Sequence, residues 1–262
     1  MMAAMRHLAL FGCPRSGTSW LGQIFNSAPD VAYRYQPLFS YEFKDWFGRH
    51  GVSDASIAAF HQALADANSP FVLQALQPAK TLATCTVWKE VRYHQLMAPL
   101  IEHRGLDALV YLVRAPVDVI NSWYLAPKEF RAGQDIHAEY RDAPSKNTSP
   151  CEFNGLAKWK ESLAMAIALR RRFPDRVHLV GYERLRQSPV AQVHALFERL
   201  GLAVAPSVLD FLMASTARRD DDPYSVFRGG RTPIELPPDI VEAIAADARA
   251  NELGRMAETL LV

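Results

Sequence analysis

Two glycines separated by four residues, directly after a short apolar run, constrain this chain more than any other feature. Residues 8–11 (Leu-Ala-Leu-Phe) have the length and composition of a buried strand. Gly12 and Pro14 then predict a sharp turn, and the apolar spacing beyond Gly17 predicts a helix from Thr18 onward. In such a strand–turn–helix, glycines let the backbone approach an anion, and free N–H groups at the helix start bind it. The segment predicts a phosphate cradle, although the glycine spacing alone also fits a plain turn.

The residues inside the turn indicate which anion it fits. A nucleotide-triphosphate loop has Lys and then Ser or Thr after its second glycine, whereas this chain has Thr18 and Ser19 there. The missing lysine is the group that normally reaches the terminal phosphates. The cation here is Arg15, whose guanidinium matches a fork of phosphate oxygens without a metal ion. We therefore expect a phosphate-type anion other than magnesium ATP.

The complete string Pro-Arg-Ser-Gly-Thr-Ser-Trp-Leu at residues 14–21 closely resembles the 5′-phosphosulfate loop of the sulfotransferases that use 3′-phosphoadenosine 5′-phosphosulfate (PAPS). It matches the carbohydrate branch of that family, which has Arg where the cytosolic branch has Lys. The resemblance implies a P-loop-like fold, PAPS as co-substrate, 3′-phosphoadenosine 5′-phosphate (PAP) as product, and no required metal. It also implies that one run of residues binds the donor: Pro14, Arg15, Ser16, Gly17, Thr18, Ser19 and Trp20.

Composition sets the class of protein and excludes several kinds of partner. The 262 residues are 49% hydrophobic and 22% charged, which fits one large globular domain spanning 1–262. A net charge of +1 gives no overall field for nucleic acid or a membrane surface. Three cysteines at scattered positions form neither a disulfide framework nor a metal site. We interpret Cys13, inside the loop, as a small space-filling residue.

The sequence also bears on location and assembly. The first predicted strand begins within ten residues, and no apolar stretch of 18 or more follows. We therefore expect a cytoplasmic protein without a membrane span, unlike the anchored eukaryotic carbohydrate enzymes of the family it resembles. The oligomeric state stays open, with a homodimer as one alternative.

Strand-like and helix-like segments alternate along the whole chain. This alternation predicts an α/β fold, a three-layer sandwich with a central, mostly parallel sheet flanked by helices. Strands are predicted over 8–11, 31–35, 86–92, 107–113 and 176–183. Helices are predicted from 18 and over 54–68, 94–104, 117–124, 155–173, 190–200, 207–217 and 239–250.

Four local predictions accompany this assignment. Asp54 is expected to cap the helix that follows it, and Gly105 to end the helix over 94–104. The aromatic residues of 39–47 favour a core role over a substrate platform. The polar stretch 125–154 is too long for a plain connection, and we expect it to form an acceptor-side loop or lid.

A second segment completes the predicted donor site. Arg114 ends a strand, and Ser122 follows eight residues later on a predicted helix. The pair resembles the family motif in which Arg and Ser hold the 3′-phosphate of the donor. By the same resemblance, Tyr182 borders the adenine and Arg228 closes over the 3′-phosphate.

The acceptor hydroxyl must lose a proton, so a base is expected within hydrogen-bonding reach. The carbohydrate branch has Glu-Pro where this chain has Gln36-Pro37, and a glutamine can only orient the acceptor. Lys89 is predicted to stabilise charge near the transferred group. Glu90 is preferred over His94 as the base, and His61 is a weaker third candidate.

We therefore expect a sulfotransferase that moves the sulfuryl group of PAPS to a hydroxyl of a sugar, glycolipid or small-molecule acceptor. Two alternatives stay open. A P-loop kinase or other NTPase is disfavoured by Thr18 at the lysine position. A non-catalytic protein that binds PAP or PAPS is suggested by Gln36.

Overall fold

The computed structural model describes residues 5–74, 83–103, 105–218, 220–227 and 232–250. Within these ranges one five-stranded sheet runs in the order β2-β3-β1-β4-β5, and every neighbouring pair is parallel. The α/β prediction is confirmed, and each predicted strand overlaps an observed one. The strands are β1 (Arg6–Phe11), β2 (Val31–Tyr35), β3 (Cys85–Glu90), β4 (Ala108–Val113) and β5 (Val177–Gly181).

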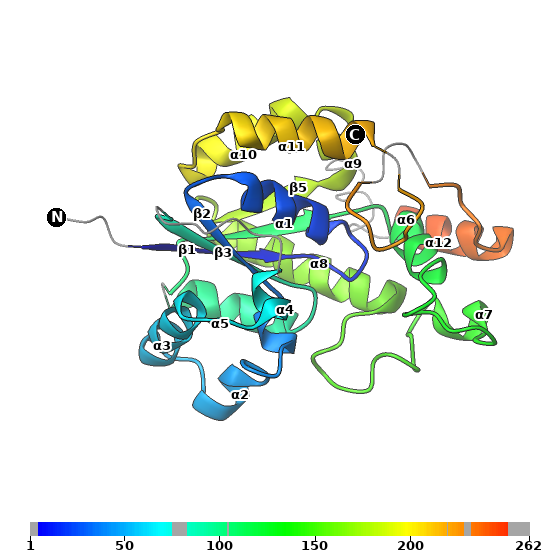
Figure 1. Cartoon of the computed structure of the whole chain (residues 1–262). Coiled ribbons are helices and arrows are strands. Elements are labelled where there is room, and N and C mark those ends of the chain that lie inside the picture. Colours follow the sequence, from blue (N-terminus) through cyan, green and yellow to red (C-terminus); the bar gives the residue numbers. More distant parts are fainter. Residues whose placement is uncertain (1–4, 75–82, 104, 219, 228–231, 251–262) are drawn as a thin grey trace.

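Helices cover both faces of this sheet (Figure 1). In the described ranges, no helix combines the length and the apolarity needed to span a membrane. The helices, with η marking a 3-10 helix, are α1 (Thr18–Ser27), η1 (Pro37–Phe39), α2 (Trp46–His50), α3 (Asp54–Ala65), α4 (Pro70–Leu73), η2 (His94–Leu96), α5 (Met97–Glu102), α6 (Pro116–Tyr124), α7 (Ile136–Glu139), α8 (Gly155–Arg172), α9 (Tyr182–Gln187), α10 (Pro189–Leu200), α11 (Pro206–Ala217) and α12 (Pro238–Ala250).

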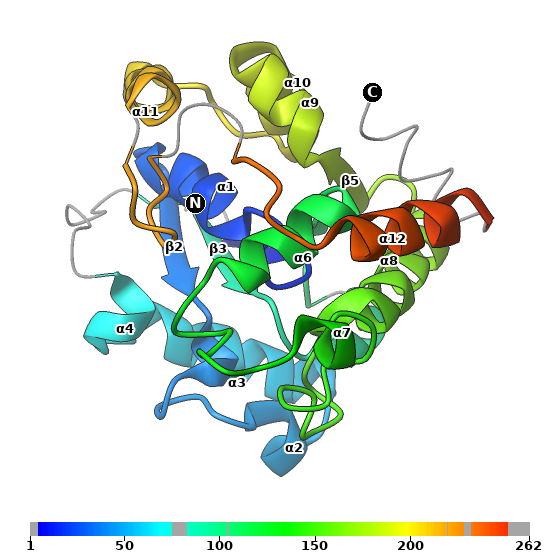
Figure 2. The same ribbon diagram turned by 90° about the vertical axis from the view of Figure 1, so that its right-hand side faces the viewer.

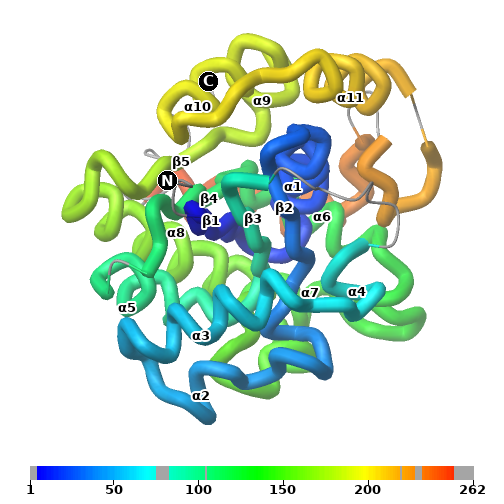
Figure 3. Tube along the Cα trace, turned by 60° about the vertical axis from the view of Figure 1, so that its left-hand side comes forward, coloured from blue at the N-terminus to red at the C-terminus, as the bar shows by residue number. Residues whose placement is uncertain are grey.

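The strand pleat distributes the apolar side chains between two cores. Leu8 and Leu10 of β1 pack with α1, α10 and α11, whereas Ala9 and Phe11 belong to the core formed with α3, α5 and α8. Successive strand residues point to opposite faces, so a strand covered on both faces needs apolar residues throughout. The run Ala-Leu-Val-Tyr-Leu-Val of β4 is buried at every position for this reason. Figure 3 shows α9–α11 on one side of the strands and α2, α3 and α5 on the other.

The order of the strands creates a ligand-binding position at the end of β1. After β1 the chain passes through α1 to β2 and β3 on one side of it, and later crosses to β4 and β5 on the other. The carboxyl end of β1 is therefore a topological switch point, where open parallel sheets bind ligands. The predicted cradle begins at this point, directly after Phe11.

Two helix ends differ from the predictions. Ser53, rather than Asp54, caps α3: its Oγ accepts from Ser56 N at 3.2 Å, and Ser56 Oγ accepts from Ser53 N at 2.9 Å. The helix predicted over 94–104 is the 3-10 turn η2 followed by α5, which ends at Glu102 without using Gly105 as a cap. Pro99 explains the split, because a residue without an N–H fits the first turn of a helix but not its middle.

The aromatic stretch only partly follows its prediction, and the acceptor-side role of 125–154 stays a prediction. In the aromatic stretch, Phe43 and Phe47 are buried as predicted, but Phe39 is 44% exposed and Tyr41 is fully exposed. Within the irregular stretch 125–154 the structure forms one short helix, α7. Figure 2 shows this stretch running from the end of α6 past α7 to the start of α8. His137 Nε2 lies 3.0 Å from Asp239 Oδ2 and connects α7 to α12.

A pair of stacked imidazoles sits at the amino end of β1, away from the switch point. The rings of His7 and His61 are 3.8 Å apart and nearly parallel. Burial and, to a smaller extent, the neighbouring His7 together lower the pKa of His61 to about 3. Burial also lowers the pKa of His7, against the opposing effect of Asp107. His61 belongs to this stack and not to the switch point, so the structure does not bring it to the predicted reaction centre.

This stack predicts a loss of stability in acid. Unfolded histidines bind a proton below about pH 6.5, but folded His61 stays neutral down to about pH 3, so the unfolding free energy falls as the pH is lowered between these values. Replacing His61→Phe should reduce the slope of that fall by roughly 1.4 kcal/mol per pH unit. Urea unfolding at a series of pH values measures the slope, with exposed His194→Phe as the control. An unchanged slope in His61→Phe would contradict the assignment.

Candidate active site

The loop after β1 has the backbone of an anion cradle. Arg15 and Gly17 both have positive φ, at 69° and 91°, and Ser16 N donates to Cys13 O at 3.0 Å to close the turn. Gly17 is also the N-cap of α1, and it has no side chain to accept from the N–H groups of the first turn. These N–H groups at the helix start are therefore available to an anion.

Close packing explains why the loop has glycine at both ends. A Cβ on Gly12 would lie 2.8 Å from the carbonyl oxygen of Leu112 in β4. A Cβ on Gly17 would lie 2.5 Å from the ring of Tyr182, the first residue of α9. Residues of β4 and α9 thus leave no room for a side chain at either position. At Gly17 the positive φ is a second reason for glycine.

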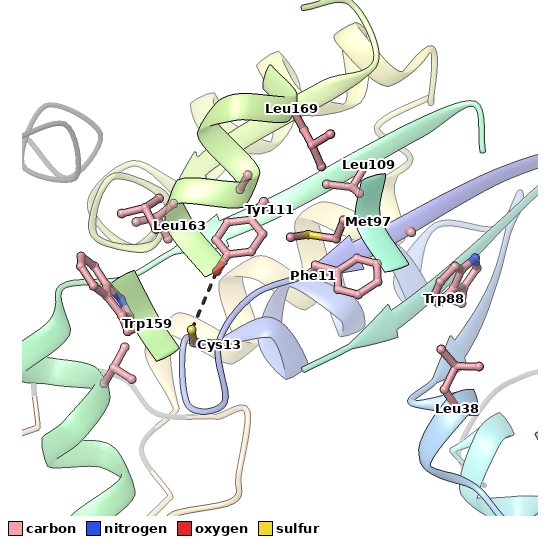
Figure 4. Close-up of a cluster of buried hydrophobic side chains, with 14 of the residues drawn as sticks. Phe11, Cys13, Leu38, Trp88, Met97, Leu109, Tyr111, Trp159, Leu163 and Leu169 are labelled. Atoms are coloured by element: carbon pink, nitrogen blue, oxygen red, sulfur yellow. Dashed lines mark hydrogen bonds between the residues drawn. The ribbon is translucent and has the colours of Figure 1, made fainter. Parts of the chain in front are cut away.

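Cys13 anchors the underside of the loop. Its side chain is buried, with Sγ 2.9 Å from Ser162 Oγ of α8, and Tyr111 OH donates to the same Ser162 oxygen at 2.7 Å. Figure 4 shows the Cys13 sulfur pointing toward the Tyr111 hydroxyl, 3.8 Å away. Burial raises the pKa of the Cys13 thiol to about 11. These contacts support the interpretation of Cys13 as a packing residue.

Arg15 connects the loop to three distant segments. Its Nε donates to Ser122 Oγ at 3.3 Å, and its Nη1 pairs with Glu129 Oε1 at 3.1 Å. Its Nη2 donates to Pro223 O at 2.6 Å, and the guanidinium lies 5.2 Å from the centre of the Tyr224 ring. The cation predicted to bind the anion therefore lies at the meeting point of α6, the 125–154 stretch and the segment after α11.

The second predicted donor segment converges on the same place. Arg114, at the carboxyl end of β4, donates from Nη1 to Arg15 O at 2.9 Å, and its guanidinium lies 4.6 Å from the Tyr182 ring centre. The Tyr182 ring meets Trp20 edge to face at 5.9 Å, and Trp20 Nε1 donates to Ser215 Oγ at 3.0 Å. Tyr182 was predicted to lie within a strand, but β5 ends at Gly181 and Tyr182 begins α9.

These groups line one cavity of about 950 Å³. Ser16 is not in its wall, because that side chain is buried beneath the loop. Arg228 lies outside the described residues. The predicted donor residues that do line the cavity are Pro14, Arg15, Gly17, Thr18, Ser19, Trp20, Arg114, Ser122 and Tyr182.

Lys89 and Gln36, at the carboxyl ends of β3 and β2, also line the cavity. Lys89 Nζ is 3.4 Å from Ser19 Oγ and 4.4 Å from the centre of the Tyr35 ring. Burial lowers the pKa of Lys89 to about 7. Gln36 N donates to Lys89 O at 2.8 Å, which holds the residue after β2 next to the end of β3. Lys89 therefore lies beside the loop, and its role as a charge stabiliser stays a prediction.

The structure does not bring Glu90 and His94 to the cavity. Neighbouring residues of a strand point to opposite faces of the sheet, so the side chains of Lys89 and Glu90 cannot lie on the same face. Glu90 is fully buried, its Oε1 accepts from Leu38 N at 2.7 Å, and burial raises its pKa to about 8. His94 is buried between the rings of Phe11 and Phe153, and burial lowers its pKa to about 3. Neither side chain is placed to receive a proton from a bound acceptor.

Several residues of the cavity wall are not marked by any pattern in the sequence. Glu129 lies within the predicted acceptor-side stretch, but no motif distinguished it there. Tyr224 and its neighbours reach the cavity from the charged, glycine-rich segment after α11. In that segment the sequence predicted a donor-binding role for Arg228 alone. Wall residues that no sequence motif marked include Glu129, Ser215, Pro223 and Tyr224.

Comparison with known proteins gives one family. The family model described as the sulfotransferase family matches residues 8–206. Carbohydrate sulfotransferase 3 of Mus musculus is 23% identical over 296 aligned positions, which cover 88% of this chain. The protein of the same name from Rattus norvegicus has the same identity and coverage of this chain. The chain spans 62% of the length of both relatives.

Solved structures show the same fold. Mouse sulfotransferase SULT7A1 complexed with PAP has a TM-score of 0.58 at 15% identity, covering 99% of this chain and 91% of its own. The sulfotransferase from Alicyclobacillus acidocaldarius has a TM-score of 0.57 at 15% identity, covering 99% of this chain and 96% of its own. At these identities the likeness concerns the arrangement of helices and strands.

The packing of Gly17 against Tyr182 yields a testable prediction. Gly17→Ala forces an alanine into the left-handed backbone conformation and also makes its Cβ clash with the Tyr182 ring. Gly133 has positive φ too, but a Cβ there would meet no atom within 4 Å, so Gly133→Ala meets only the penalty of the left-handed conformation. The left-handed penalty alone is roughly 1–2 kcal/mol. Denaturant unfolding should show a larger loss for Gly17→Ala than for Gly133→Ala. The difference should disappear in a Tyr182→Ala background, and its persistence there would contradict the proposed contact.

Proposed function

The chain belongs to the sulfotransferase family, and we propose that it transfers the sulfuryl group of PAPS to a hydroxyl of a sugar, glycolipid or small-molecule acceptor. The observation that carries this proposal is the convergence of Arg15, Arg114 and Ser122 on one cavity at the switch point of the sheet. Two guanidinium groups and a row of helix-start N–H groups suit a donor with two separate anionic groups.

The residues present fit the two ends of PAPS. The loop N–H groups and Arg15 would hold the 5′-phosphosulfate, and Arg114 with Ser122 would hold the 3′-phosphate. A specific observation supports the second assignment: Arg114 Nε is buried and has no hydrogen-bond partner among the described residues. A buried donor of this kind is costly to leave unpaired, and a phosphate oxygen would satisfy it. Trp20 and Tyr182 would border the adenine.

Bound PAPS would supply an activated sulfuryl group whose departure leaves negative charge on the 5′-phosphate. Lys89, beside Ser19 of the loop, is placed to stabilise that charge. An anion next to Nζ favours the ammonium form and opposes the effect of burial on the pKa of Lys89. Arg15 would act on the same group, so the developing charge would be near two cations of the cavity wall.

The acceptor would enter beside Gln36. This part of the wall also contains Tyr35, Phe39 and Arg92, so it combines aromatic surface with polar groups. Such a wall suits a sugar ring or a small polar molecule with an apolar face. The carbohydrate sulfotransferases among the relatives support the choice of a sugar hydroxyl as the first acceptor class to test.

A nucleotide-binding measurement tests the donor. PAP at about 100 times its Kd should stabilise the fold by roughly 2.7 kcal/mol, visible as a rise in Tm. We expect this rise with PAP, and not with ADP or magnesium ATP, because only PAP offers a 3′-phosphate to Arg114. Arg114→Ala should abolish it, whereas Arg49→Ala, an exposed arginine on α2, should leave it unchanged.

The opposite results are equally informative. An equal shift with magnesium ATP would revive the kinase or NTPase alternative. A PAP shift that survives Arg114→Ala would show that the 3′-phosphate binds elsewhere. Tight PAP binding with no turnover of PAPS on any acceptor would favour the non-catalytic binding protein.

A further inference from the structure

The proposed reaction needs a proton acceptor, and none of the residues predicted as the base supplies it. The Lys89 amine is not counted among them, because an anion beside it favours its charged form, which has no lone pair for a proton. The Gln36 amide cannot take a proton from the acceptor hydroxyl, and the Glu90 carboxyl faces away from the cavity. The phenol of Tyr35 is equally unsuited, because burial raises its pKa. If the protein transfers sulfuryl groups to alcohols, the base must be another side chain of the cavity wall.

Four carboxylates line the cavity in the described part of the chain: Asp118, Glu129, Glu152 and Glu183. Asp118 lies in the first turn of α6, and Glu183 in the first turn of α9 accepts from Ala115 N at 3.2 Å. Both belong to the end of the cavity assigned to the 3′-phosphate. Glu152 is paired with Arg92 at 3.2 Å. Of the four, Glu129 is the carboxylate that forms an ion pair with the loop that would hold the phosphosulfate.

Glu129 stands at the boundary between the donor and acceptor sides. Its Oε1 pairs with Arg15 Nη1 at 3.1 Å. It also lies close enough to Lys89 and Tyr35 to affect the ionisation of both side chains. Its carboxylate is therefore near both cations that we assign to the transferred group.

The backbone holds Glu129 in this position. Glu129 N donates to Ala126 O at 2.8 Å, which closes a turn after α6. The preceding Lys128 N donates to Tyr224 OH at 2.7 Å, and the following Phe130 is buried edge to face against Trp123. The anchored neighbours fix the backbone of Glu129, and the ion pair with Arg15 holds its carboxylate at this point of the wall.

We propose that Glu129 is the general base that accepts the proton of the acceptor hydroxyl. This inference rests on the proposed function. In the step, the acceptor O–H bond breaks and its proton passes to a Glu129 oxygen, while the acceptor oxygen forms a bond to sulfur. The bond from sulfur to the 5′-phosphate oxygen breaks, and its electron pair leaves with PAP. The Glu129 side chain is 30% exposed, so the proton can then pass to water.

The contact with Arg15 fits this role. While Arg15 Nη1 is paired with Glu129, that N–H cannot serve the donor. When Arg15 binds the phosphosulfate, the carboxylate loses this partner and gains accessible lone pairs beside the transferred group. The base would therefore become available as the donor binds.

The test compares Glu129→Gln with Glu152→Gln, which removes the same charge from the same cavity. PAP release from PAPS is followed with three acceptors: water, an alkyl glycoside and 4-nitrophenol. Glu129→Gln should lower kcat about 100-fold or more with the glycoside and with water, because general bases contribute factors of this size. The loss should be much smaller with 4-nitrophenol, which is largely ionised at mildly alkaline pH and needs no base. Glu152→Gln should show no such dependence on the acceptor, and Glu129→Asp should recover part of the rate.

Titration with PAP separates this inference from the proposed function. Wild type that does not bind PAP would refute the sulfotransferase function itself. If PAP binds, Glu129→Gln should bind it at least as tightly, because Arg15 loses a competitor. Tighter PAP binding with unchanged kcat would overturn the base and leave Glu129 as a group that only occupies Arg15. An equal loss with all three acceptors, or wild type that binds PAP but turns over PAPS with none, would also overturn it.

Discussion

The left-handed backbone of the loop between β1 and α1 is the constraint on which the rest of the site depends. Arg15 and Gly17 both have positive φ, which exposes the N–H groups of the helix start. Gly12 lets the loop pass the Leu112 carbonyl of β4, and Gly17 leaves room for the Tyr182 ring of α9. A side chain at either glycine would push one of these elements away. Gly12 and Gly17 therefore determine both the shape of the anion cradle and the packing of the strands and helix around it.

The pleat of β3 separates two charged neighbours and gives them different environments. Lys89 faces the cavity, where Ser19 and the Tyr35 ring surround its amine. Glu90 faces the interior, where it accepts from the backbone of Leu38. Burial acts on the two groups in opposite directions, lowering the pKa of Lys89 to about 7 and raising that of Glu90 to about 8. Both shifts favour the neutral form, but only the Lys89 amine is placed to meet a ligand that restores its charge.

The net charge of the chain is only +1, so any attraction of the cavity for an anion comes from charged residues in its own wall. Cations and carboxylates from distant parts of the chain pair with one another across its wall, as Arg15 does with Glu129 and Arg92 with Glu152. These internal pairs hold long side chains in place before any ligand arrives. An anionic ligand has to compete with the carboxylates for the same N–H donors, so donor binding and the freedom of the acidic side chains are coupled.

The sequence by itself determined the features that depend on local spacing. The strand–loop–helix, the buried β4 and the Arg114–Ser122 pair follow from glycine positions, apolar runs and an offset of eight residues, all within single segments. Only the tertiary structure decided which charged residues face the cavity, because a one-residue difference along a strand reverses the face. It also brought Glu129 and Pro223 to Arg15, across separations of 114 and 208 residues. Contacts over such distances arise from the packing of whole elements, and no local pattern encodes them.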